Sequence, residues 1–214
     1  MIYTLICIYL IVINVFSFFV TIIDKYNAKK GKWRIKENTL LYVGRLLETK
    51  GVYDIVEAFA KVSKSFSNYT LQFIGDGDKE VKDHLLELVD TYQLKDKVEF
   101  LGYKNNVSDY MKRAKAIIVP SRFEAFGLIT AEAMDNGCLV IGRNTAGTKV
   151  QFDNGVSFTG NEIAIRYDSF SELEIAIKRV LTMASDKYNE MVIRAHDTAL
   201  YYYNVDKSAA DVIS

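Results

Sequence analysis

The sequence is poor in the residues from which disulfide frameworks and metal centres are built. It contains two cysteines and two histidines in 214 residues. Cys7 and Cys138 have neither the number nor the spacing of a disulfide framework or a zinc site, which favours a reduced, cytosolic compartment. His84 and His196 lie in separate polar, helix-like stretches, so we expect two ordinary surface residues and no histidine-ligated metal.

An excess of charge of one sign is also missing. Lysine plus arginine and aspartate plus glutamate each number 27, so the formal net charge is zero. A basic field that would hold nucleic acid by counterion release is therefore excluded. The length suffices for one sizeable core. Half of the residues are hydrophobic, slightly more than in an ordinary soluble domain, and the additional hydrophobic residues are concentrated at the amino terminus.

The apolar excess lies in the uncharged run from Ile2 to Ile23, which is long enough for a helix that spans a bilayer. Six lysine or arginine residues follow between Lys25 and Lys36, so the positive-inside rule places the remainder in the cytoplasm. We predict a single-pass membrane anchor in residues 1–23 and a basic linker in residues 24–38. A cleavable signal peptide fits poorly, because no basic segment precedes the run and no small residues end it. The alternative is a relic of a truncated gene start.

Short apolar runs alternate with amphipathic helical patterns from Thr39 onward, which predicts an α/β fold with a Rossmann-like parallel sheet in residues 39–214. We expect strands at 39–43, 69–74, 98–101, 116–119, 138–142 and 162–167, and helices at 52–66, 79–92, 107–114, 127–136, 171–183 and 187–202. In such a sheet the loops that follow the strands share one edge, where ligands bind.

Two cations follow the first expected strand in the segment VGRLLETKG. Arg45 offers a planar fork to phosphate oxygens, Lys50 offers a point charge, and the helix that begins nearby has free N–H groups. This combination indicates an anion site beside Gly44. The alternative is a solvated loop that happens to carry two charges.

The segment SRFEAFGLITAE follows a later strand and contains two glutamates. Glu124 falls in the loop and Glu132 in the second turn of the next helix, while Phe126 to Leu128 present backbone N–H groups at the helix start. Carboxylates accept hydrogen bonds from sugar hydroxyls, and the N–H groups favour phosphate. A glycosidase-like acid and base would have to flank one bond. The arrangement therefore favours binding of a sugar diphosphate.

These motifs, together with VEFLGY and GCLVIGRNTAGT, resemble in order and spacing the carboxyl-terminal, donor-binding domain of GT-B glycosyltransferases of the glycogen-synthase-like group 1 family. The resemblance covers the chain from about Leu40 to the end. It implies a nucleotide-sugar ligand, retaining transfer of the sugar to an acceptor hydroxyl, no metal and no cofactor, and it identifies no catalytic nucleophile. The implied contacts are Arg45, Lys50, Gly44 and the backbone of Phe126, Gly127 and Leu128 for the diphosphate, Glu124 for the donor sugar, Glu132 for the ribose, and Tyr103 beside the base.

A glycine-rich segment, FIGDGDKE, also lies at this edge. Gly75 and Gly77 would let a ligand approach the backbone. Asp76 and Asp78 resemble the Asp-x-Asp metal site of the other large glycosyltransferase fold, but both directly precede a helix, so we expect them to cap its N–H groups instead.

The chain departs from the family pattern at three places. Ala125 replaces a glycine, and Val150 replaces a glutamate that follows Ala146-Gly147. The family's amino-terminal Rossmann domain has no counterpart in residues 24–38. We therefore expect the acceptor site to come from another polypeptide or the membrane surface. The alternatives are a non-catalytic nucleotide-sugar-binding module or gene fragment and, more weakly, a GT-B sugar-nucleotide epimerase.

Overall fold

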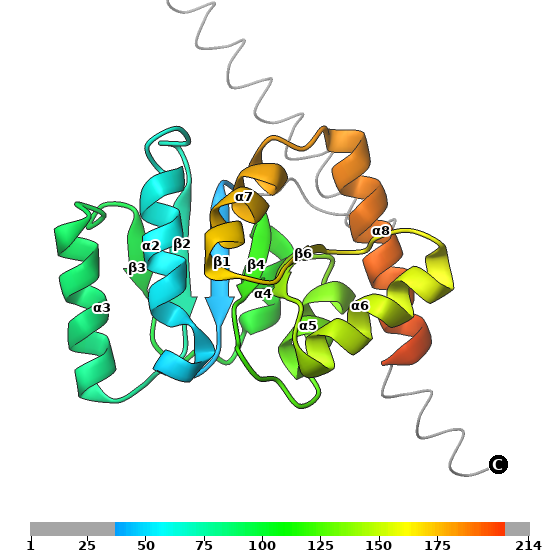
Figure 1. Cartoon of the computed structure of the whole chain (residues 1–214), viewed down its shortest axis with the longest axis horizontal. Helices are drawn as coiled ribbons and strands as arrows, with labels where there is room; N and C mark the ends of the chain where they lie inside the picture. The colour runs from blue at the N-terminus through cyan, green and yellow to red at the C-terminus, as the bar shows by residue number, and fades with distance from the viewer. Residues whose placement is uncertain (1–36, 204–214) are drawn as a thin grey trace, which may run out of the picture. The chain divides into compact units, whose positions relative to one another are not determined.

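A computed structural model describes residues 37–203, in which six parallel strands form one sheet in the order β3-β2-β1-β4-β5-β6 (Figure 1). The strands are β1 (Thr39–Val43), β2 (Thr70–Ile74), β3 (Val98–Phe100), β4 (Ala116–Val119), β5 (Leu139–Arg143) and β6 (Ile165–Tyr167). The predicted α/β fold with a parallel sheet is confirmed. The predicted membrane anchor lies outside the described residues, and within residues 37–203 no helix is long and apolar enough to cross a membrane.

Helices cover both faces of the sheet. They are α2 (Val52–Val62), α3 (Lys79–Thr91), α4 (Val107–Arg113), α5 (Leu128–Asp135), α6 (Ala146–Thr159), α7 (Phe170–Leu181) and α8 (Ser185–Tyr202), with a short 3₁₀ helix, η1, at Glu48–Lys50. Helix α2 packs against α3 and α7 in one layer, while α5 packs against α4, α6 and α8 in the other. The sheet is thus buried between two helical layers.

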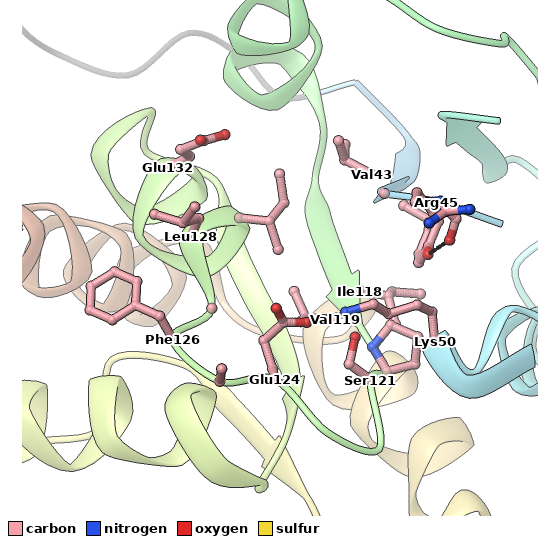
Figure 2. A pocket seen from close by; sticks show the side chains of 16 residues that line it. Val43, Arg45, Lys50, Ile118, Val119, Ser121, Glu124, Phe126, Leu128 and Glu132 are labelled. Carbon is pink, nitrogen blue, oxygen red and sulfur yellow. Dashed lines mark hydrogen bonds and ion pairs between the residues drawn. The ribbon is translucent and has the colours of Figure 1, made fainter. Parts of the chain in front are cut away.

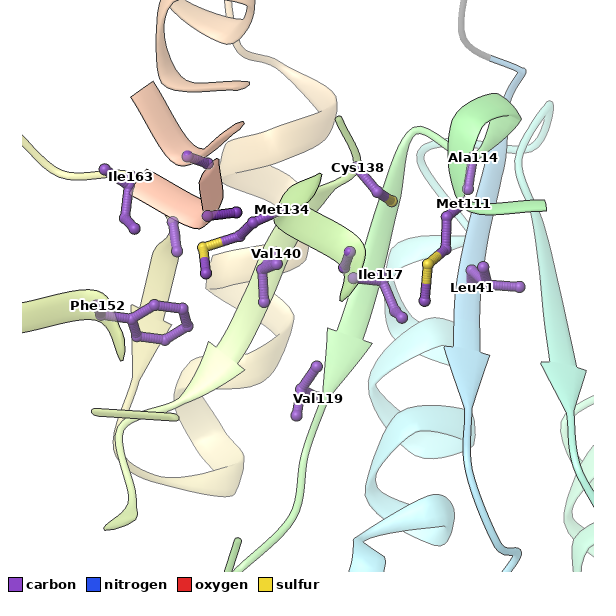
Figure 3. Close-up of a cluster of buried hydrophobic side chains, with 14 of the residues drawn as sticks. Leu41, Met111, Ala114, Ile117, Val119, Met134, Cys138, Val140, Phe152 and Ile163 are labelled. Atoms are coloured by element: carbon purple, nitrogen blue, oxygen red, sulfur yellow. The ribbon is translucent and has the colours of Figure 1, made fainter. Parts of the chain in front are cut away.

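The strands are apolar on both faces because both faces are covered. All four residues of β4, the segment AIIV, are buried, and so are Leu40 and Leu41 in β1. Between the sheet and the α5 layer, Ile117 shares an apolar cluster with Met134 and Cys138 (Figure 3). Cys138 is 1% exposed and packs there as a small hydrophobic residue.

The order of the strands reverses direction between β1 and β4. These two strands are hydrogen-bonded neighbours, with Leu40 opposite Ala116 and Leu41 opposite Ile117, yet their following helices lie on opposite faces of the sheet. At such a switch point the two loops diverge and leave a crevice at the carboxyl ends of the strands. The loops that diverge here carry Arg45 and Glu124.

Helix α6 was not predicted from the sequence. Its buried residues, Gly147, Thr148, Gln151, Phe152 and Gly155, follow helical spacing, but most of them are small or polar. A periodicity of hydrophobic residues is therefore absent, and two glycines further lower the helix propensity. The helix is held by tertiary packing rather than by its own sequence pattern.

Candidate functional site

A cavity of about 530 Å³ opens at the switch point, between the loops that follow β1 and β4 (Figure 2). Its walls include most of the residues that the sequence assigned to a donor, namely Gly44, Arg45, Lys50, Glu124, Phe126, Gly127, Leu128 and Glu132. Tyr103 does not line it. The structure thus confirms that these loops meet at one edge of the sheet. The binding roles of their residues stay predictions.

Lys50 and Glu124 are in direct contact across this cavity. The Lys50 Nζ atom donates a hydrogen bond to a Glu124 carboxylate oxygen at 2.7 Å, and the two side chains are 31% and 22% exposed. The sequence assigned them to different parts of a ligand and gave no sign of this ion pair, because 74 residues separate them. The contact joins the two walls of the crevice.

Arg45 is the second cation of the cavity, and it is exposed. Within residues 37–203 its guanidinium makes no hydrogen bond or ion pair, so all of its donors are available to a ligand. The buried Tyr42 hydroxyl donates to the Arg45 carbonyl at 2.7 Å and so fixes the turn after β1. Burial, and then the charge of Glu124, raise the pKa of Tyr42 well above its usual value, which keeps the hydroxyl protonated.

Helix α5 begins beside the cavity, and Gly127 occupies its N-cap position with φ = 80°. The backbone N–H groups of Phe126, Gly127 and Leu128 donate to no other group in the described part of the chain. Free N–H groups and the positive end of the helix dipole both favour an anion. The placement predicted for these three residues is correct.

Glu132 lies in the second turn of α5, at the far end of the cavity from Lys50 and Ser121 (Figure 2). Its side chain is exposed, and its carboxylate has no partner among residues 37–203. Glu124 and Glu132 therefore face different parts of the same cavity, as a ligand with two hydroxyl-bearing groups would require.

The loop that carries Glu124 is held by the start of α6, which the sequence analysis missed. The Gly147 amide donates to the Glu124 carbonyl at 2.7 Å, and the Thr145 hydroxyl donates to the Ser121 carbonyl at 2.9 Å. A Cβ atom on Gly147 would lie 2.6 Å from the Phe126 backbone. The match of Ala146-Gly147 to the family pattern was the one signal in the sequence that this segment matters. It did not indicate that Gly147 packs against the donor loop.

A second hollow, of about 470 Å³, adjoins the first along Val43, Gly44 and Arg45, and Tyr103 lines it. Tyr103 is 78% exposed. The base-proximal residue of the sequence analysis thus lies on the other side of Arg45 from Lys50 and Glu124.

The glycines of the FIGDGDKE segment are required by close packing between two loops, which the sequence analysis did not predict. A side chain on Gly75 would overlap the Gly44 carbonyl, and one on Gly77 would overlap the Leu46 carbonyl. The Leu46 amide also donates to the Asp76 carbonyl at 2.8 Å. These glycines are needed because the loops after β1 and β2 pack directly on each other, and both glycines also line the second hollow, where the predicted approach of a ligand stays a prediction.

The predicted capping of α3 by the two aspartates is wrong for both Asp76 and Asp78. Asp78 occupies the N-cap position of α3, but its side chain accepts no capping hydrogen bond. Asp76 instead accepts from the Gly77 amide at 2.9 Å and pairs with Lys82 at 2.6 Å. The hydrogen bond from Lys82 and that from the Gly77 amide hold the pKa of Asp76 below its usual value. Residues 37–203 contain no group of three or more metal-ligating side chains.

Residues 24–197 match the protein family described as glycosyl transferases group 1. The chain belongs to this family. The glycogen synthase of Acholeplasma laidlawii is 32% identical over 167 residues, which is 73% of this chain and 32% of that protein. The N-acetyl-alpha-D-glucosaminyl L-malate synthase of Bacillus anthracis is 31% identical over 119 residues, 56% of this chain and 30% of that protein. The matched part of the chain thus spans about a third of the length of either relative.

Solved structures show the same fold. The C-terminal domain of the group 1 protein LpcC from Francisella tularensis superposes with a TM-score of 0.68 at 19% identity, covering 85% of this chain and 93% of that one. Anabaena HepE in complex with UDP and glucose gives 0.71 at 19% identity, over 83% of this chain and 48% of that one. The group 1 domain is therefore one half of a GT-B fold, as the sequence predicted.

Proposed function

We propose that this domain binds the nucleoside diphosphate of a nucleotide-activated sugar in the crevice between the β1 and β4 loops. The observation that carries the proposal is the convergence of the unpaired Arg45 guanidinium with the free amides of Gly127 and Leu128 on one cavity. Charge-assisted hydrogen bonds and helix-start amides are the usual means of holding phosphate. A cavity of about 530 Å³ is also of the size that takes small ligands.

The parts of the donor are assigned along the cavity. We assign the diphosphate to Arg45, Lys50 and the loop amides, the sugar to Glu124, and the ribose to Glu132. The base would lie toward Tyr103. Lys50 has three donor hydrogens, so it can keep its hydrogen bond to Glu124 while another hydrogen meets a phosphate oxygen. The ion pair would then connect the diphosphate and sugar positions.

The proposed activity is retaining transfer of the sugar to an acceptor hydroxyl in glycan or polysaccharide biosynthesis. The departing diphosphate would be stabilised by Arg45, Lys50 and the loop amides, which replace a divalent ion in this role. Asp76 is already engaged by Lys82 and the Gly77 amide. We therefore propose that donor binding needs neither metal nor cofactor.

We further propose that a second, acceptor-binding Rossmann-like domain completes the reaction site, since transfer depends on groups positioned on both sides of the reacting bond. A capsular polysaccharide biosynthesis glycosyltransferase, CapH of Staphylococcus aureus, is 27% identical to this chain over 110 residues, 51% of this chain and 31% of that protein. With the anchor in residues 1–23, the domain would lie at the cytoplasmic side of a membrane, where a lipid-linked acceptor is accessible.

The test is calorimetry on the purified full-length chain in detergent, with UDP, GDP, ADP, CDP and dTDP and their glucose conjugates. Binding of at least one diphosphate is expected, and failure of all of them would contradict the proposal. A transfer assay then follows, with radiolabelled donor, a lipid acceptor pool and a companion Rossmann-domain protein. Binding without transfer under all of these conditions would favour the non-catalytic binding module.

A further inference from the structure

Gln151 is a buried amide behind the donor loop. It lies on α6, is 1% exposed, and uses both hydrogens of its Nε2 atom, toward the Phe126 carbonyl at 2.6 Å and the Gly127 carbonyl at 3.1 Å. Val150, which stands where the family pattern has glutamate, is 57% exposed and points away from the core. The contact to the loop is thus made by the next residue along the helix.

The two hydrogen bonds decide where the loop amides point. In a planar trans peptide, the C=O and N–H groups project in opposite directions. The Phe126 carbonyl shares its peptide unit with the Gly127 N–H, and the Gly127 carbonyl shares its unit with the Leu128 N–H. Because Gln151 draws both carbonyls inward to α6, both N–H groups are turned away from α6, on the side where Gly127 and Leu128 line the cavity.

The Phe126 carbonyl depends on Gln151 alone. The Gly127 carbonyl also accepts from the Thr130 amide at 2.9 Å, whereas the Phe126 carbonyl has no second donor in the described part of the chain. Gly127 has no side chain to resist rotation of the preceding peptide, so this unit is free to turn over once its hydrogen bond is lost. The orientation of the Gly127 N–H is therefore set from α6.

We propose that Gln151 is a positioning residue for the donor diphosphate, which acts by aiming the Gly127 N–H group into the cavity, beside the Leu128 N–H group that the first turn of α5 already orients. The inference rests on the proposed function and extends it to a residue that does not line the cavity. The loss of Gln151 should affect binding of the phosphates and not of the nucleoside, since the base and ribose are assigned to Tyr103 and Glu132.

The variant that isolates this role is Gln151→Met, which keeps the length of the side chain and removes both donors. Thr148→Val is the matched control. Thr148 is 1% exposed on the same helix, makes no hydrogen bond to the loop, and changes to valine with almost no change in shape. Thermal unfolding of both variants would show whether the fold is kept.

Calorimetry with UDP, inorganic pyrophosphate and uridine separates phosphate from nucleoside binding, with another base used if the unchanged protein prefers it. Gln151→Met should weaken UDP and pyrophosphate by at least about tenfold, as expected when hydrogen bonds to a charged group are lost. Uridine affinity should stay within about twofold, and Thr148→Val should match the unchanged protein. Equal losses for UDP and uridine, or no loss for UDP, would overturn the inference.

A second measurement needs no variant. Addition of pyrophosphate to ¹⁵N-labelled unchanged protein should shift the Gly127 and Leu128 amide resonances more than those of α3, and unmoved resonances at both positions would overturn the inference. If the unchanged protein binds no diphosphate at all, the proposed function fails and the inference with it. If it binds UDP but Gln151→Met binds equally well, only the role of Gln151 is refuted.

Discussion

The ammonium group of Lys50 lies 2.7 Å from the carboxylate of Glu124, and this contact joins the loop after β1 to the loop after β4. Each loop follows a strand beside the switch point of the sheet, where ligands of doubly wound folds bind. The ion pair lies on the wall of the cavity, so a bound donor would meet a cation and an anion that are already positioned against each other.

The Lys50–Glu124 pair should stabilise the fold modestly. Lys50→Met should lower the free energy of unfolding by about 0.5–1 kcal/mol, because both side chains are partly exposed and solvent screens the attraction. Urea unfolding of both single variants and of Lys50→Met with Glu124→Gln gives the coupling. The Asp76–Lys82 pair is the control, since it is 68% and 43% exposed and should show almost no coupling. Equal coupling in the two pairs would contradict this interpretation.

Glu124 and Glu132 should respond differently to the sugar of the donor. Glu132→Ala should weaken a nucleoside diphosphate and its sugar conjugate alike, because the ribose is common to both ligands. Glu124→Ala should weaken the conjugate, with the free diphosphate changed far less. Calorimetry with UDP and UDP-glucose, or the preferred base, measures the contrast. Equal losses for both ligands in both variants would refute the division of roles.

Donor binding should be independent of divalent ions. Asp76 is engaged by Lys82 and the Gly77 amide, and the diphosphate is assigned to Arg45, Lys50 and helix-start amides. The affinity for UDP should therefore be the same in EDTA as in magnesium or manganese. An affinity lost in EDTA and restored by either metal would instead support a metal site at Asp76 and Asp78.

Gly147→Ala should disturb both stability and binding. The new Cβ would lie 2.6 Å from the Phe126 backbone, so the donor loop must shift, at a cost of about 1–3 kcal/mol in the free energy of unfolding. Gly155→Ala on the same helix is the control, because its new Cβ would overlap the buried side chain of Ile163 and not the donor loop. Both variants should be less stable by urea unfolding, while UDP affinity should fall for Gly147→Ala alone. A similar loss of UDP affinity in both variants would contradict this prediction, because it would mean that any disturbance of α6 weakens binding.

The sheet and the edge that carries the site were predictable from the sequence. Buried parallel strands such as β4 read as short apolar runs, and the carboxyl ends of parallel strands share one edge. Arg45, Lys50, Glu124 and Glu132 follow such strands, so their convergence required no knowledge of long-range contacts.

The support behind the site was not predictable. Helix α6 buries glycine, threonine and glutamine at helical spacing, which leaves no hydrophobic periodicity to detect. The Lys50–Glu124 contact depends on how far each loop projects beyond its strand. Likewise, Gly75 and Gly77 suggested an approaching ligand, whereas the atoms that approach them are carbonyls of the neighbouring loop. Glycine in a loop indicates close contact but does not identify the partner.

The most direct test of the account is the affinity of an Arg45→Ala variant for UDP, or for the base that the unchanged protein prefers, measured by calorimetry. Arg45 lines the cavity with a guanidinium that has no partner within residues 37–203, so its removal should weaken binding by about 1.5–3 kcal/mol. Arg179→Ala, an exposed arginine of α7, removes the same charge away from the cavity and should leave the affinity unchanged. Equal affinities for Arg45→Ala and the unchanged protein would contradict a diphosphate site in this crevice.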